Sequence, residues 1–210
     1  KWASRTCFAT TFRRSQRYAL LPSNHWTLAF DTSAAHVAAA LLCDGQIIGK
    51  AIEPMAKGQA EALFPLIDDL LKCHDLACSD LNRIGVGIGP GNFTGIRISV
   101  SAARGLALAL GIPAIGVSNF EATAHPHARP VSVEIAAPRD MAYVQSFLSD
   151  GTTSNPIMTA ATGAHIPLAP IDALIETIAI IAETAAAIAP PTPLYIKPAD
   201  AAPSRDAPVI

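Results

Sequence analysis

The sequence predicts an α/β domain, built on a mixed sheet with helices packed against it. From Trp26 onward, three short apolar runs are separated by turn residues, and apolar stretches with helical spacing then alternate with short strand-like stretches. The resulting order, β-β-β-α-β-α-β, combines antiparallel hairpins with crossover connections, which is typical of a mixed sheet covered by helices. The 210 residues suffice for one large domain or two small lobes.

The first 25 residues differ in composition from the rest and are left out of this prediction. They are rich in Ser and Thr, and no acidic residue precedes Asp31. Such a composition resembles a transit peptide, and an upstream extension with no fold of its own is the alternative. We expect residues 1–25 to be an unstructured basic extension. Its basic residues are Lys1, Arg5, Arg13, Arg14 and Arg17.

Residues 26–52 are predicted to form three antiparallel strands. Asp44-Gly45 lies between two apolar runs and indicates a hairpin, because both turn positions favour a positive φ. The polar turn Asp31-Thr32-Ser33 separates the first two runs. The expected strands are 26–31, 36–43 and 46–52.

The next stretch predicts an amphipathic helix over residues 61–74, because apolar residues recur at intervals of three and four. Pro65 fits in the first turn, where its missing N–H costs nothing. We therefore expect the helix to begin near Glu61 or to kink at the proline. The recurring apolar residues are Leu63, Phe64, Ile67, Leu70 and Leu71.

A glycine-rich loop, GPGNFTG, joins a short strand to a second helix over residues 94–110. Gly111 and Pro113 follow in the usual pattern that ends a helix. The stretch AIGVSN predicts another strand, and residues 119–125 predict a short helix or loop.

The pattern is weaker after Pro130. A hairpin is expected around Pro138-Arg139-Asp140, followed by a polar stretch and a helix over residues 171–188. The last residues are rich in proline and should lie extended on the surface. We therefore predict an N-terminal lobe (26–125), a shortened C-terminal lobe (126–193) and a Pro-rich tail (194–210).

Composition excludes several classes of function. The net charge of −2 provides no broad basic field for tight, autonomous binding of nucleic acid. The four cysteines form no CxxC pair, which favours a reduced, cytoplasmic chain. Glu176, Glu183 and Pro113 interrupt the apolar runs, so no membrane span is expected. The six histidines form no HxxxH or HExxH pair, and no metal site is predicted.

The glycine-rich loop has the ingredients of an anion site, since glycines allow close approach and the following helix offers free N–H groups. It matches neither GxxxxGK[ST] nor the spacing of GxGxxG. Nucleotide binding and simple packing of the loop therefore both remain open. The candidate nucleotide-binding residues are Asp31, Thr32, Ser33, Gly89, Gly91, Thr94 and Gly95.

The second helix has small or apolar residues on nearly every face, which predicts burial on all sides. The sheet covers one face, and the first helix covers only part of the rest, so a partner is expected on the remaining surface. Arg97 and Arg104 lie seven residues apart, on one stripe suited to the rim of such an interface.

Three stretches together resemble the TsaB (YeaZ) family of bacterial proteins over about residues 27–122. These are AFDTSAAHVAAALLCDGQIIG, LFPLIDDLL and IGVGIGPGNFTGIRISVSAARGLALALGIPAIGVSNFEA. Asn92 stands where the family usually has serine, and the Gly-Asp-Gly region expected before the last helix is missing.

The resemblance implies an actin-like, Hsp70-like or sugar-kinase-like (ribonuclease H-like) lobe without catalysis of its own. Such a subunit pairs with its catalytic paralogue, TsaD, which makes threonylcarbamoyladenosine in tRNA, and an ATPase subunit, TsaE, completes the complex. It implies no cofactor on this chain alone, with ATP and a divalent metal in the complex, and contact with tRNA only through the complex. The apolar helix also allows a homodimer. The expected partner-interface residues are Leu63, Phe64, Ile67, Arg97, Val100 and Arg104.

Two other functions compete with this scaffold role. The first is an ATP-dependent phosphotransferase or ATPase of the same fold, using Asp31 and the glycine-rich loop. The second is a metal-dependent glycoprotease, which the absence of an HxxxH pair disfavours.

Overall fold

A six-stranded mixed sheet forms the larger part of the structure, a computed structural model that describes residues 8–9 and 24–196. The strand order is β1-β4-β3-β2-β5-β6, in which the pairs β1–β4, β4–β3 and β3–β2 are antiparallel and the pairs β2–β5 and β5–β6 are parallel. The expected α/β class with a mixed sheet is confirmed. The strands are β1 Phe8–Ala9, β2 Trp26–Asp31, β3 His36–Cys43, β4 Gln46–Pro54, β5 Arg83–Gly87 and β6 Ala114–Val117.

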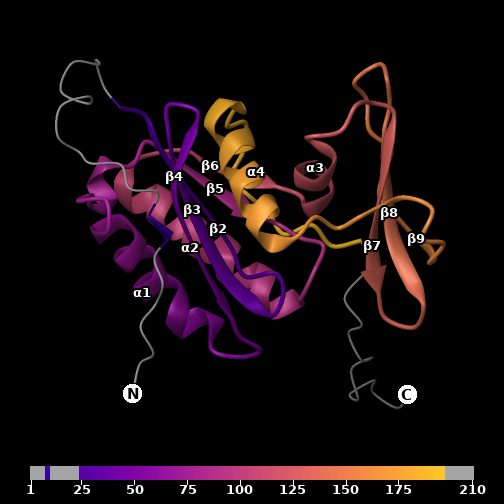
Figure 1. Cartoon of the computed structure of the whole chain (residues 1–210), viewed down its shortest axis with the longest axis horizontal. Coiled ribbons are helices and arrows are strands. Elements are labelled where there is room, and N and C mark those ends of the chain that lie inside the picture. The colour runs from indigo at the N-terminus through magenta and orange to yellow at the C-terminus, as the bar shows by residue number, and fades with distance from the viewer. Residues whose placement is uncertain (1–7, 10–23, 197–210) are drawn as a thin grey trace, which may run out of the picture.

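Helices cover both faces of this sheet (Figure 1). On one face, α1 (Gln59–Lys72) and α2 (Phe93–Leu110) pack against large side chains such as Leu28 and Phe30. On the other, α4 (Ile171–Thr184) packs against small ones such as Ala29 and Ala38. Successive residues of a strand point to opposite faces of the sheet. Large and small residues alternate along β2, so the helices on one face pack on large side chains and α4 on the other face packs on small ones.

The position of α4 corrects the predicted division into lobes. The sequence placed this helix in the second lobe, but it packs against β5, β2 and β3 of the first sheet. Arg83 of β5 fixes its end, donating from Nη1 to the carbonyls of Ala182 (2.7 Å), Glu183 (2.9 Å) and Ala185 (2.7 Å). These bonds satisfy carbonyl groups that a helix C-terminus leaves unpaired. The helix therefore ends at Thr184, short of the predicted residue 188.

The second lobe is a four-stranded sheet in the order β10-β7-β8-β9. The short helix α3 (Asn119–Ala124) contacts β7 on one side and α4 on the other. Phe120 of α3 joins Val133 and Phe147 in a small core of its own. The strands are β7 Val131–Ala137, β8 Met141–Phe147, β9 Ile157–Ala160 and β10 Ile166–Pro167.

Several predicted boundaries differ from the observed ones. α1 begins at Gln59 after Gly58, which has a φ of 91°, so Pro65 lies beyond the first turn. Phe8–Ala9 pairs with β4 inside the extension expected to be unstructured, and the remaining residues up to 23 lie outside the described part. The Pro-rich tail is described to Ile196, and Leu194 N donates to Ile88 O (2.9 Å), next to β5.

α2 begins at Phe93 and ends before Gly111, which has a φ of 66°, close to the predicted bounds. Among the described residues, it alone is long and apolar enough to cross a membrane by length and composition, although no span was expected. A core helix of a globular domain meets the same two criteria. α2 packs into the core through Ile96, Val100 and Ala103.

Candidate functional site

The turn after β2 buries the first of the candidate nucleotide-binding residues. Asp31 Oδ1 accepts hydrogen bonds from Ser33 N and Ser33 Oγ, both at 2.9 Å, and lies 2.8 Å from His36 Nε2. Asp31 and Thr32 have no exposed surface, and Ser33 is 2% exposed. Within the described residues, Asp31 Oδ2 has no hydrogen-bond partner, and a Cβ at Gly87 would overlap it. The carboxylate is therefore enclosed by the protein.

The glycine-rich loop packs onto this turn. Asn92 N donates to Ser33 O (2.6 Å), and Thr32 Oγ1 donates to Gly95 O (2.7 Å). A Cβ at Gly91 would overlap Ser33 O, and one at Gly95 would overlap Thr32 O. These glycines therefore let two pieces of backbone meet, as the packing interpretation of this part of the loop expects.

The structure brings the candidate nucleotide-binding residues together, but most are inaccessible. Gly89 and Gly95 are buried with the turn, whereas Gly91 and Thr94 are exposed at the start of α2. Asn119, at the start of α3, was not predicted and belongs to the same cluster. It donates from Nδ2 to Pro90 O (2.9 Å) and Ser33 Oγ (3.3 Å). The sequence predicted a strand that ends at Asn119 or a short helix or loop that begins there, and neither prediction indicates a contact with the Asp31 turn.

The predicted partner interface divides into two groups. Leu63, Ile67 and Val100 are 1–3% exposed and lie in the core beneath the helices, so their assignment to a surface was wrong. Amphipathic spacing marks an apolar face without saying whether the sheet or a partner covers it. Phe64, by contrast, is 49% exposed.

The accessible face of α2 is a stripe of residues three or four apart, which we call the α2 stripe. Leu108 in this stripe is 87% exposed, and a Cβ at the neighbouring Gly105 would meet no other atom. The helix contains two arginines and no acidic residue. Leu108 and Phe93 were not predicted, although both continue the spacing of Arg97 and Arg104. The α2 stripe consists of Phe93, Arg97, Ser101, Arg104 and Leu108.

A hollow of about 630 Å³ adjoins the C-terminal half of this stripe. Its walls are mostly apolar, and Arg104 is the charged residue that lines it. Leu108 of α2 and Ile188, which is 92% exposed and lies in the segment after α4, both line it. Two large aliphatic side chains exposed to this degree are typical of a surface that a partner covers.

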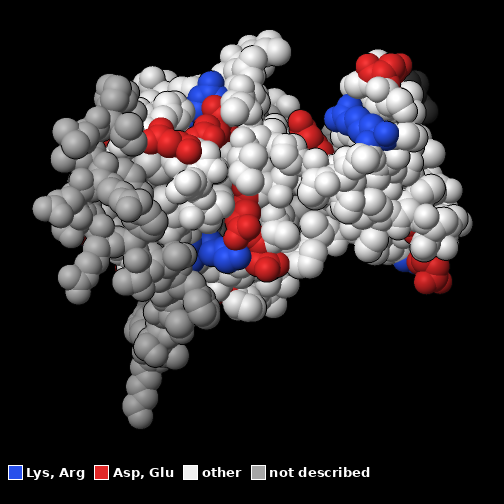
Figure 2. Space-filling model, turned by 45° about the horizontal axis from the view of Figure 1, so that its top comes forward, with Lys and Arg blue, Asp and Glu red and all other residues white. Residues whose placement is uncertain are grey.

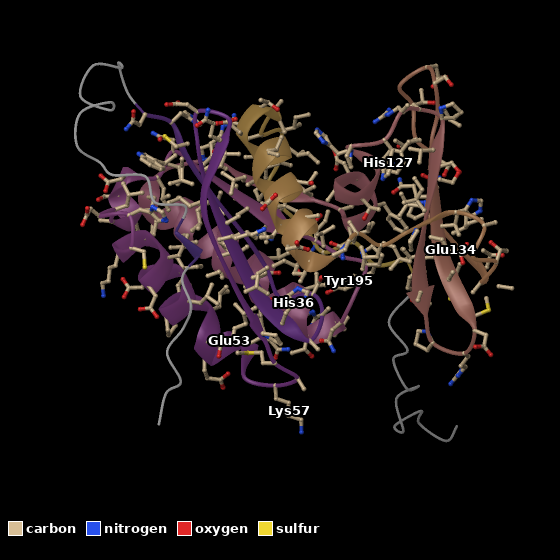
Figure 3. The ribbon with its side chains drawn as sticks, viewed as in Figure 1. His36, Glu53, Lys57, His127, Glu134 and Tyr195 are labelled. Atoms are coloured by element: carbon tan, nitrogen blue, oxygen red, sulfur yellow. The ribbon has the colours of Figure 1, made fainter. Side chains whose placement is uncertain are left out.

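The other end of the stripe carries an aromatic contact. The rings of Phe93 and Tyr195 stack with their centroids 5.1 Å apart and their planes at 30°. The Arg97 guanidinium carbon lies 4.0 Å from the Phe93 centroid, and Arg97 Nε donates to Tyr195 Oη (3.0 Å). Figure 3 shows Tyr195 between the large sheet and the second sheet. The sequence placed Tyr195 in an extended tail and did not predict the contact.

Charge is sparse on the face shown in Figure 2, where acidic and basic side chains gather in a few groups on an otherwise uncharged surface. This agrees with the content of charged residues, 15% of the chain. No group of three or more potential metal ligands occurs among the residues that the structure describes.

Residues 53–170, more than half of the chain, match the family model of TsaD, tRNA N6-adenosine threonylcarbamoyltransferase. The TsaB protein of Bacillus subtilis, named for tRNA threonylcarbamoyladenosine biosynthesis, is 39% identical over 97 residues, covering 46% of this chain and 42% of that protein. TsaB of Escherichia coli is 36% identical over 93 residues, covering 44% and 40%. The chain thus spans less than half the length of these relatives.

Solved structures agree with this similarity. YeaZ from Pseudomonas aeruginosa is 31% identical, with a TM-score of 0.53 over 64% of this chain and 67% of that one. A second Pseudomonas aeruginosa protein, described as similar to peptidase YeaZ, shares the fold with a TM-score of 0.60 and 24% identity. That match covers 82% of this chain and all of the other.

Proposed function

This chain belongs to the TsaB (YeaZ) family, and we propose that it is a non-catalytic subunit in the biosynthesis of threonylcarbamoyladenosine in tRNA. In this proposal it binds a TsaD-type threonylcarbamoyltransferase and supports that enzyme's activity. The contact surface is the C-terminal half of the α2 stripe, the adjoining hollow and Phe64 of α1.

The exposure of Leu108 is the observation that carries the proposal. Leu108 is 87% exposed on a helix whose opposite side is packed in the core, so a partner that covers it would bury a large apolar side chain. Burial of one leucine contributes roughly 1.5–3 kcal/mol. Gly105 beside it leaves room for a helix of the partner to approach closely.

The match to the TsaD model supports the choice of partner. The matched residues 53–170 include both α1 and α2, so a TsaD protein is expected to carry equivalent helices. Two related folds can pack equivalent surfaces against each other about a pseudo-twofold axis, as identical subunits do about a true one. The same geometry allows a homodimer of this chain when its partner is absent.

The buried turn supports a non-catalytic role. A carboxylate that serves phosphate or metal chemistry must reach its ligand, whereas Asp31 is fully buried and already accepts bonds from Ser33. Binding a nucleotide there would require the glycine-rich loop to separate from the turn. In the proposed assembly, ATP and a divalent metal are therefore bound elsewhere, with the TsaE-type ATPase as a further subunit. The assembly acts in the cytoplasm and contacts tRNA as a complex.

The first test is affinity for the TsaD-type protein of the same genome, measured by calorimetry and gel filtration. Leu108→Glu and Arg104→Glu place a charge or reverse one at the proposed contact. Each should weaken binding about 10-fold or more, which corresponds to about 1.4 kcal/mol. Their melting temperatures should stay close to that of the wild type, because both positions are exposed.

Ile157→Glu is the matched control, since Ile157 is an apolar residue, 57% exposed, on β9 of the second sheet. It should bind as the wild type does. Val100→Glu is unsuitable as a test because Val100 is 3% exposed and the new charge would be buried in the core. Wild-type affinity in both α2 variants would contradict the proposed surface.

A further inference from the structure

The N-terminal end of the α2 stripe differs in chemistry from the proposed protein contact at the other end. Here Phe93, Arg97 and Tyr195 form what we call the aromatic–arginine cluster. Both rings remain 44% exposed although they stack on each other. Rings that served only to tie Tyr195 to the helix would gain more from deeper burial. The cluster therefore leaves part of both aromatic side chains accessible beside the Arg97 guanidinium.

Arg97 brings a positive charge that no carboxylate of the described residues pairs with. Its contacts within the described part of the chain are the Phe93 ring and Tyr195 Oη, and it forms no ion pair there. The hydrogen bond to Tyr195 uses Nε, so the two Nη groups have no partner among the described residues. No acidic residue occurs between Asp80 and Glu121 in the sequence, so α2 itself supplies no competing negative charge.

We propose that the aromatic–arginine cluster binds an unpaired nucleotide of RNA. Aromatic rings and guanidinium planes are the surfaces on which unstacked bases pack in protein–RNA complexes. The free Nη groups of Arg97 can donate to two oxygens of one phosphate, as guanidinium groups commonly do. The proposal rests on the proposed function, which brings tRNA to the complex that contains this chain.

The weak overall field explains why this contact acts within a complex. The chain has a net charge of −2, and the face in Figure 2 carries no broad basic patch. Phosphate attraction from one or two arginines alone gives little affinity at physiological salt. Stacking adds a contact that salt does not screen, so the cluster would position an RNA that the partner subunit also holds.

The test measures binding of fluorescein-labelled tRNA to the assembled complex with the TsaD-type partner. Phe93→Leu keeps an apolar side chain and removes the π face, and Arg97→Gln removes the charge. Phe93→Leu should weaken tRNA binding about 10-fold, within the range for loss of one stacked base, and Arg97→Gln should weaken it less and reduce its salt dependence. Arg139→Gln, which removes an exposed arginine from the turn between β7 and β8, is the matched control and should bind as the wild type does.

Two further readouts separate this role from a purely structural one. Ultraviolet crosslinking of tRNA containing 4-thiouridine should label the peptide with Phe93 or Tyr195 in the wild type and not in Phe93→Leu. Adenosine monophosphate should not displace tRNA below millimolar concentrations. Displacement at micromolar concentrations would assign the cluster to free nucleotides and overturn the RNA assignment.

The outcomes also distinguish the two proposals. If the complex forms with Phe93→Leu and Arg97→Gln and binds tRNA with wild-type affinity, the cluster is not an RNA contact, whatever the fate of the proposed function. If no complex forms even with the wild type, the proposed function fails. In that case, tRNA containing 4-thiouridine is crosslinked to the isolated chain at low salt. The assignment of the cluster to RNA is rejected if neither Phe93 nor Tyr195 is labelled.

Discussion

The imidazole of His74 lies against the backbone of β4, so closely that a Cβ at Gly49 would overlap its Nε2. Nε2 is buried and has no hydrogen-bond partner among the described residues. Burial therefore lowers the pKa of His74 below its ordinary value of 6.5, and the charge of Asp75 offsets part of this effect. The folded protein binds a proton here less readily than the unfolded chain does.

A histidine with a lowered pKa makes stability depend on pH in one direction. As the pH falls below 6.5, the unfolded chain gains the proton first, so the free energy of unfolding decreases. His74→Phe keeps an aromatic ring and removes the titration. Urea unfolding at pH 7.5 and 5.5 should show a smaller loss of stability in this variant than in the wild type. His127→Phe changes an exposed histidine and should leave the loss unchanged; an unchanged loss in His74→Phe would contradict the account.

The sequence does not show which apolar residues of a helix lie in the core and which lie on the surface. Val100 and Leu108 lie on the same apolar helix, yet one is 3% and the other 87% exposed. Residue type is nearly the same at both positions, and only the direction toward the sheet distinguishes them. Asp31 illustrates the same limit, since an acid followed by two hydroxyl residues fits a phosphate contact and a capped turn equally well.

At the scale of elements, α4 depends on one distant arginine. Arg83 Nη1 donates to three carbonyl groups at the end of this helix, nearly 100 residues further along the chain. Arg83→Met removes these donors while keeping an aliphatic stem of similar length. The free energy of unfolding should fall by about 1 kcal/mol or somewhat more, because the three carbonyl groups are only partly buried and water can reach them in part.

Hydrogen exchange measured by mass spectrometry shows where this loss acts. Amides of the last turn of α4 should exchange faster in Arg83→Met, and those of α1 should not. Arg83→Lys retains one donor group and should lie between the wild type and Arg83→Met in stability. Wild-type stability in Arg83→Met would show that the three bonds contribute nothing.

Elements with local signals were predicted, and elements that depend on distant contacts were not. The hairpin at Asp44-Gly45 and the end of α2 at Gly111 each follow from a positive φ that few residues adopt. The position of α4 depends instead on distant contacts, such as the packing of Ile178 against Ala29, nearly 150 residues earlier in the chain. Apolar periodicity identified the helix but not the sheet that it covers. β9 and β10 are short and lie in a polar stretch, so they were missed.

At the scale of the whole molecule, the two sheets have separate cores joined through α3. Phe120 and Ala124 of this helix belong to the core of the second sheet, and Ala122 belongs to the layer beneath α4. The second core is small, and it includes Leu194 and Ile196 from the segment after α4. The proposed partner surface lies mainly over α1 and α2, on the face of the first sheet opposite α4 (Figure 1), and its hollow is also lined by Ile188 and Pro191 of the segment after α4.

This separation predicts that damage to the second core leaves partner binding intact. Phe147 is 3% exposed in the second core, and Phe147→Ala should cost about 3 kcal/mol or more by leaving a cavity. Hydrogen exchange should rise in β7 to β9 and remain unchanged in β2 and β5, while affinity for the TsaD-type partner stays within about twofold of the wild type.

Leu41→Ala, in the core beneath α1, is the matched control and should raise exchange in the first sheet and weaken the partner complex. Equal effects of both variants on both sheets would mean that the molecule unfolds as one unit, because α3 would then couple the two cores more strongly than their separate packing indicates.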